Sequence, residues 1–174
     1  MHSLHRHSIV TASLALLVFS AQAHDISAKD TDRSPDEWIA LGETVHGGFG
    51  SHIALGIRIG QDALHRLNAK RREVDVSVTE GKNAPCACVA DGLVVATSAS
   101  PGQKTLTVNA KSQDAAYLAV IEVKNRATGA TATYRVPSSM IETLAKMNPG
   151  KSAKQRFEAV FAMPQSQLFE VSTK

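Results

Sequence analysis

The chain has 174 residues, of which 43% are hydrophobic and 5% aromatic, and its formal net charge is +3. One domain with its own core is the natural expectation at this length. The positive balance is mild and no basic stripe alternates with aromatic residues, so a nucleic-acid partner is not expected.

The first 23 residues have the pattern of a secretory signal peptide. Arg6 precedes the apolar run SIVTASLALLVFS, and the tripeptide AQA ending at Ala23 is a small-x-small cleavage site. This run is too short to span a bilayer and no other long apolar run follows, so no membrane-spanning segment is expected. We therefore expect cleavage after Ala23 and a periplasmic or secreted mature protein.

Two helices are expected after a polar, flexible segment at 24–33. Ser34, Pro35 and Glu37 form a capping-box pattern that predicts a helix ending near residues 42–45. Ser51 can cap a second helix that runs to about residue 68, because apolar residues recur there at helical spacing. In this second helix Gly56 and Gly60 lie one turn apart, which would let another backbone come close.

The remaining pattern mixes strands and helices. Valines alternating with polar residues predict a strand over 74–79, and the Ala- and Val-rich stretch 86–97 predicts a buried helix. Further strands are expected at 104–109, 117–124, 131–136 and 168–171, with helices around 140–145 and 157–161. Helices and antiparallel strands without a βαβ rhythm predict an α+β domain over residues 34–174.

The residues best suited to bind a ligand lie in two short segments. A glycine-rich loop holds His46 and runs into the second helix, where His52 lies in the first turn. The only two cysteines, Cys86 and Cys88, stand at the start of the buried helix, and Asp91 lies three residues after Cys88. Imidazole and thiolate are common ligands of zinc and related metals, and a helix N-terminus favours thiolate over thiol.

The cysteine pair allows two functional interpretations. In an oxidising compartment two cysteines are normally expected to form a disulfide. A bridge between residues only two apart closes a very small ring and adds little chain-entropy stabilisation. A redox-active or metal-binding pair therefore fits better than a structural disulfide, while burial of small apolar side chains remains the plain alternative.

Three segments resemble the E-subunit family of formylmethanofuran dehydrogenase. The first is His46-Gly47 followed by ALGIR at 54–58; the second is Cys88 with Asp91 and Thr97; the third is the hairpin NRATG at 125–129 with its continuation YRV. Residues 168–171, LFEV, also resemble the C-terminal segment of the family. The resemblance covers nearly the whole expected mature chain.

This resemblance implies an α+β fold with a His/Cys metal site, commonly zinc, and often a dimer. His46, Cys88 and Asp91 match the family's site positions. Gly48 and Gly50 stand where the family has a second histidine and a cysteine, and Ala99 stands where a further cysteine is frequent. The chain is therefore similar to the family but divergent and exported, and His52 and Cys86 are the residues that could replace the missing ligands.

The resulting hypothesis is a metal-binding protein with a small anionic ligand in an open coordination position. Zinc is the first expectation, with copper and nickel as alternatives. The metal ligands would come from His46, His52, Cys86, Cys88 and Asp91. The glycine loop could bind the anion through Gly47, Gly48, Gly50 and Ser51, and Arg58 would add a charged donor if it turned to that pocket.

Two alternatives remain open at this point. The same metal could activate a water or a substrate in an enzyme, with His52 or Asp91 as acid or base. Alternatively, the chain could be a metal-free small-molecule binder or the partner of another protein in a complex. A homodimer is a further expectation, because Gly56 and Gly60 would give the second helix a flat face.

Overall fold

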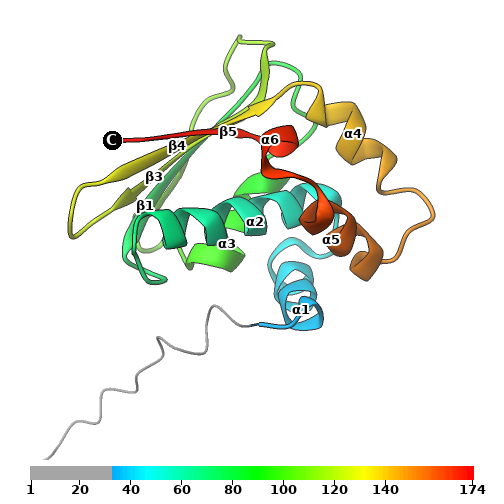
Figure 1. Cartoon of the computed structure of the whole chain (residues 1–174), viewed down its shortest axis with the longest axis horizontal. Coiled ribbons are helices and arrows are strands. Elements are labelled where there is room, and N and C mark those ends of the chain that lie inside the picture. Colours follow the sequence, from blue (N-terminus) through cyan, green and yellow to red (C-terminus); the bar gives the residue numbers. More distant parts are fainter. Residues whose placement is uncertain (1–32) are drawn as a thin grey trace, which may run out of the picture.

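A computed structural model describes residues 33–174, so the expected signal peptide and residues 24–32 lie outside the described residues. Six helices and five strands follow one another in this part of the chain (Figure 1). In order they are α1 (Pro35–His46), α2 (Ser51–Arg66), β1 (Val74–Glu80), α3 (Cys88–Thr97), β2 (Leu106–Val108), β3 (Tyr117–Asn125), β4 (Thr131–Pro137), α4 (Met140–Lys146), α5 (Ala153–Ala162), α6 (Gln165–Leu168) and β5 (Glu170–Thr173).

The five strands form one mixed sheet in the order β2-β1-β3-β4-β5. Three of the neighbouring pairs are antiparallel, and only β1 and β2 run parallel. This pair is parallel because α3 joins the two strands as a crossover helix, a unit that the sequence analysis did not anticipate. The predicted α+β class is confirmed, and the sheet is mostly antiparallel.

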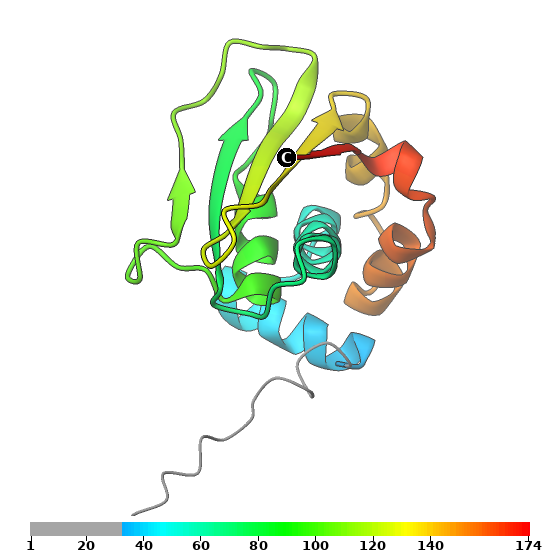
Figure 2. The same cartoon turned by 60° about the vertical axis from the view of Figure 1, so that its left-hand side comes forward.

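Helix α2 is the centre of the molecule. Figure 2 looks almost along its axis and shows the sheet on one side, α5 and α6 on the other, and α1 below. Because it is enclosed in this way, most of its side chains are buried, and Leu55, Ile57 and Ile59 are fully inaccessible to solvent. The apolar stripe read from the sequence is therefore one part of a helix that is covered on nearly all sides.

The glycines of α2 allow the expected close approach, and the partner is α3. A Cβ atom at Gly56 would lie 2.2 Å from the carbonyl oxygen of Val89, and one at Gly92 would lie 2.2 Å from that of Ile53. At Gly60 a Cβ would meet that of Ala96 at 2.5 Å. This face is thus filled inside the chain, so it cannot support the dimer expected from a flat helix surface.

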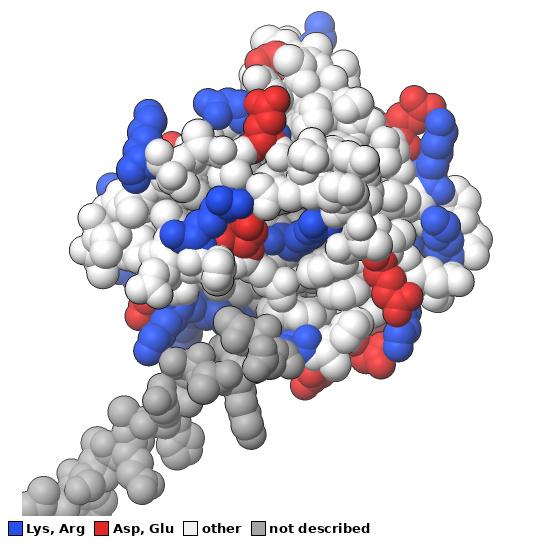
Figure 3. All heavy atoms as spheres, viewed as in Figure 1, with Lys and Arg blue, Asp and Glu red and all other residues white. Residues whose placement is uncertain are grey.

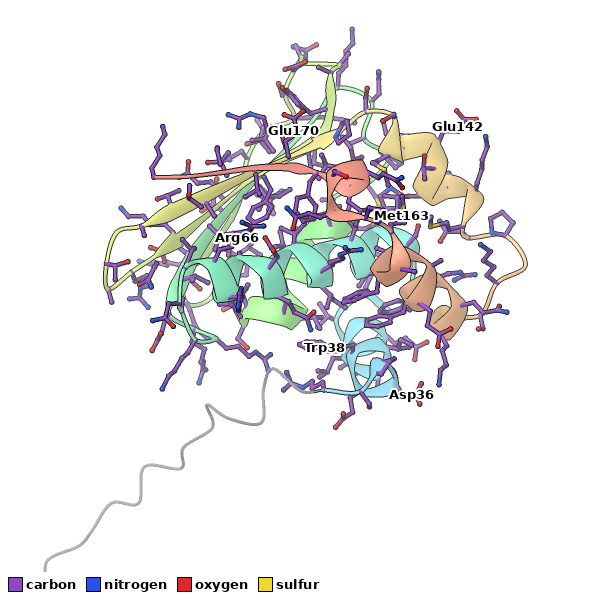
Figure 4. All side chains as sticks on the ribbon, viewed as in Figure 1. Asp36, Trp38, Arg66, Glu142, Met163 and Glu170 are labelled. Atoms are coloured by element: carbon purple, nitrogen blue, oxygen red, sulfur yellow. A yellow bond between two sulfur atoms is a disulfide. The ribbon has the colours of Figure 1, made fainter. Side chains whose placement is uncertain are left out.

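The start of α1 follows the predicted capping box. The Ser34 side chain accepts from the backbone N–H of Glu37, and the Glu37 carboxylate accepts from that of Ser34, with Pro35 as the first helical residue. Trp38, buried to 3% exposure, lies on the side of α1 that faces the other helices, whereas Asp36 points away (Figure 4). The cap therefore sets the helix in the register that buries Trp38.

Several element ends differ from the sequence prediction. The N-cap of α2 is Gly50, and Ser51 is its first residue, with a hydroxyl that donates to the carbonyl of Leu144. Helix α3 begins at Cys88 rather than Cys86. The expected strand at 168–171 begins at 170, because residues 165–168 form the short helix α6 after Pro164.

On the face shown in Figure 3, lysine and arginine side chains are interspersed with aspartate and glutamate. No extended surface of one charge covers this face. None of the helices within residues 33–174 combines the length and the apolar character that crossing a bilayer would require.

Candidate functional site

A pocket of about 450 Å³ lies where the glycine loop meets the segment before α3. We call it the glycine-loop pocket. It brings together the end of α1, the start of α2, the segment that carries both cysteines and the α4–α5 connection. Its wall consists of His46, Gly48, Phe49, Gly50, His52, Ile53, Pro85, Cys86, Cys88, Ala145, Asn148 and Arg156. The two segments singled out in the sequence thus share one pocket.

His46 is the last residue of α1 and not a loop residue as expected. Gly47, at φ +83°, ends the helix in the left-handed conformation, and its N–H donates to the carbonyl of Glu43. The imidazole Nδ1 lies 2.6 Å from Oδ2 of Asp91, which comes from the first turn of α3. Asp91 therefore fixes the orientation of the His46 ring through Nδ1, and this contact does not use Nε2.

His52 is the most buried titratable side chain of the pocket, with 7% of its surface exposed. Its Nε2 is buried and has no hydrogen-bond partner. Burial lowers the pKa of His52 below its ordinary value, because the charged ring would be poorly solvated. The folded protein therefore holds a neutral imidazole in the wall of the pocket, which is the form that ligates metals.

The lowered pKa of His52 predicts a pH-dependent stability. Below about pH 6.5 the unfolded chain binds a proton at His52, whereas the folded chain does not until a lower pH is reached. The free energy of unfolding therefore decreases as the pH falls. Urea unfolding measures the free energy of unfolding at about pH 7.5 and about pH 5.5. The decrease between these two pH values should be smaller in His52→Gln than in the wild type. His65→Gln, at an exposed position of α2, serves as the matched control and should behave as the wild type. Equal losses in the wild type and His52→Gln would contradict the prediction.

Cys86 and Cys88 are joined by a disulfide, and both are partly exposed. Cys88 is the first residue of α3, and Cys86 lies outside the helix but still lines the pocket. In this state neither sulfur is a thiolate. The sequence left a redox-active pair and a metal-binding pair open, and the structure shows the oxidised form of that pair.

The glycine loop offers fewer free backbone donors than expected. The N–H of Gly47 is used by the cap of α1, and the N–H of Ser51 donates to the side chain of Asn148. Arg58 does not line the pocket, because its guanidinium is turned to the C-terminal end of α5, where it donates to the carbonyls of Val160 and Phe161.

The cation at the pocket is Arg156, which the sequence analysis missed. It comes from α5 and donates to the carbonyls of Phe49 and Asn148, both at 2.8 Å. Its Nε is buried and has no hydrogen-bond partner. No local sequence pattern indicates that Arg156 lies at this pocket, because the residues whose carbonyls it binds are 107 and 8 positions away.

Among the described residues, the donor set of the disulfide state does not fit a metal ion. Within residues 33–174, no three His, Cys, Asp or Glu side chains are arranged so that they could hold a metal. The disulfide removes both sulfurs as donors, since thiolate is the ligating form. After reduction, the pocket wall would contain two imidazoles and two thiols, a donor set typical of zinc.

The comparison with protein families agrees with the resemblance read from the sequence. The family model described as "FmdE, Molybdenum formylmethanofuran dehydrogenase operon" matches residues 45–170. No curated protein was found to match the chain. The matched region begins next to His46, contains all the side chains of the glycine-loop pocket and covers well over half of the sequence. The chain therefore belongs to the FmdE family.

Proposed function

We propose that this chain is an exported metal-binding protein whose ion, zinc in the first instance, binds in the glycine-loop pocket when Cys86 and Cys88 are thiols. One observation carries the proposal: His46, His52 and both cysteines line one pocket. The leader ending at Ala23 supports export to the periplasm or beyond. Histidine and cysteine side chains would hold the ion, and a bound zinc would supply Lewis-acid character to an anion beside it.

The roles of the protein groups follow from their contacts. Asp91 fixes the tautomer and the orientation of His46 through Nδ1, so that Nε2 is presented for coordination. His52 contributes a neutral ring whose Nε2 lacks any other partner. Arg156 lies in the wall of the same pocket and favours a negatively charged ligand there.

The proposal is tested by element analysis of the full-length chain expressed with its own leader and without a histidine tag. After reduction and incubation with zinc, we expect about one ion per chain. His46→Ala and Cys88→Ser should each weaken binding by at least about tenfold, whereas His65→Ala, on the exposed side of α2, should leave it unchanged. A reduced protein that binds no zinc, or an equal loss in His65→Ala, would contradict the proposal.

A second candidate function is the binding of a small anion without a metal. It is favoured by the disulfide together with the two unpartnered nitrogens, His52 Nε2 and Arg156 Nε. Such buried polar atoms are costly unless a ligand or water satisfies them. Titration of the metal-free disulfide form with inorganic phosphate, followed by calorimetry in wild type and Arg156→Met, separates this function from the first.

A further inference from the structure

The Cys86–Cys88 disulfide lies in the wall of the glycine-loop pocket, and both of its residues are accessible to solvent. We propose that this disulfide is redox-active and exchanges with the cysteine thiols of a peptide substrate. This activity goes beyond the binding of a metal and needs no metal. It assigns to the oxidised pair a reaction of its own, carried out from the same pocket.

The disulfide is not needed to hold its segment in place. The segment before α3 is already fixed by hydrogen bonds, from the N–H of Gly81 to the carbonyl of Leu118 and from Lys111 Nζ to the carbonyl of Ala84. A bridge across a sequence separation of 2 restricts the unfolded chain very little. A disulfide between partly exposed residues that contributes little to stability can break and re-form without loss of the fold.

The two sulfurs differ in their surroundings. Cys88 is the first residue of α3, and the N-terminus of that helix has no side-chain cap. Its backbone N–H groups and helix dipole stabilise the negative charge that develops on Cys88 Sγ when the bond breaks. Cys86 lies outside the helix, so the helix N-terminus does not stabilise a negative charge on its sulfur in the same way. Cys88 is therefore the better leaving group, and Cys86 Sγ is the atom attacked.

The exchange balances as a two-electron reaction. A substrate thiolate bonds to Cys86 Sγ, the Sγ–Sγ bond breaks, and its electron pair goes to Cys88. A second substrate thiolate then attacks the substrate sulfur of the mixed disulfide and releases Cys86. The substrate dithiol becomes a disulfide, the protein becomes a dithiol, and the two substrate protons pass to the protein thiols. A small-molecule disulfide such as glutathione disulfide reoxidises the protein.

The surroundings of the sulfurs indicate the class of substrate. Phe49, Ile53 and Pro85 give the pocket wall an apolar part beside the disulfide, and the pocket volume of about 450 Å³ accommodates a side chain. A cysteine-containing peptide with an apolar residue next to its thiol matches this wall. Such segments are exposed in exported chains that have not yet formed their own disulfides.

The test measures oxidation of a synthetic peptide with two cysteines, each beside a leucine, in the presence of glutathione disulfide and EDTA. The full-length chain, expressed with its own leader, should accelerate peptide disulfide formation about tenfold or more over the Cys86→Ser, Cys88→Ser double variant. With a peptide that carries a single cysteine, the wild type should form a mixed disulfide between Cys86 and the peptide while Cys88 becomes a thiol, and alkylation of Cys88 followed by mass spectrometry identifies this species. The matched control Lys82→Ala, at an exposed position of the segment before α3, keeps both sulfurs and the uncapped helix N-terminus and should retain the wild-type rate.

A second measurement uses only the wild-type protein, so its result does not depend on whether the cysteine variants fold. Without glutathione disulfide, alkylation of the wild type should reveal two new thiols for each peptide disulfide formed. A wild-type rate equal to that of the double variant, or a disulfide that stays intact while the peptide is oxidised, would overturn the proposal. Because EDTA is present throughout, failure of this reaction and failure of zinc binding are separate results.

Discussion

Alanine at Gly92 should lower the free energy of unfolding by about 2–3 kcal/mol, although alanine favours a helix by about 1 kcal/mol relative to glycine. Its Cβ would lie 2.2 Å from the carbonyl oxygen of Ile53 and 2.8 Å from the Cα of Gly56. These are backbone atoms of α2 and cannot rotate away. Helices α2 and α3 would have to move apart, and the core side chains packed around α2 would lose contacts.

Urea denaturation followed by circular dichroism measures this loss. Gly102→Ala is the matched control, because its Cβ would meet no atom within 4 Å and should change stability by less than about 0.5 kcal/mol. If Gly92→Ala proved as stable as that control, the close contact between α2 and α3 would be wrong.

Replacing Arg156 by methionine should cost about 2–3 kcal/mol of stability and loosen the glycine-loop pocket. The guanidinium donates to two carbonyls. A hydrogen bond from a charged group contributes about 1.5–3 kcal/mol net, and two bonds made by one side chain do not add in full. Methionine keeps much of the apolar stem, so the loss reports mainly on the guanidinium. Phe49, on the glycine loop, would lose the bond that ties it to α5.

The free energy of unfolding and amide exchange at residues 48–51 measure the two effects. Lys154→Met is the control from the same helix, since its contact with Asp36 at 3.5 Å is an exposed ion pair worth at most about 1 kcal/mol. Arg156→Lys should recover only part of the loss, because an ammonium cannot span both carbonyls as the planar guanidinium does. Full recovery by lysine would contradict the bridging role.

Local signals in the sequence were sufficient for much of the fold. The Ser34–Glu37 capping box and Pro35 predicted α1, and the confirmed interactions are all within three residues. The alternating valines predicted β1, whose residues alternate between buried and more exposed positions at its start. The glycine spacing in α2 predicted a close approach, but not that α3, from the same chain, makes it.

Long-range relations were beyond the sequence. The parallel pairing of β2 with β1 depends on the path of α3. The orientation of Arg58 depends on the carbonyls at the end of α5, about a hundred residues later, and Arg156 reaches the glycine loop over a similar separation. Composition alone likewise could not decide between two thiols and the disulfide at Cys86 and Cys88.

The central position of α2 has a consequence for biosynthesis. Its neighbours come from both ends of the described chain, since α1 precedes it and α5 follows it by almost ninety residues (Figure 2). A nascent polypeptide that lacks α5 leaves the helix open along one flank, and Arg58 then has no carbonyls to bind. The core can therefore close only after nearly all of the polypeptide has been synthesised, so the newly made chain stays incompletely packed until α5 is available.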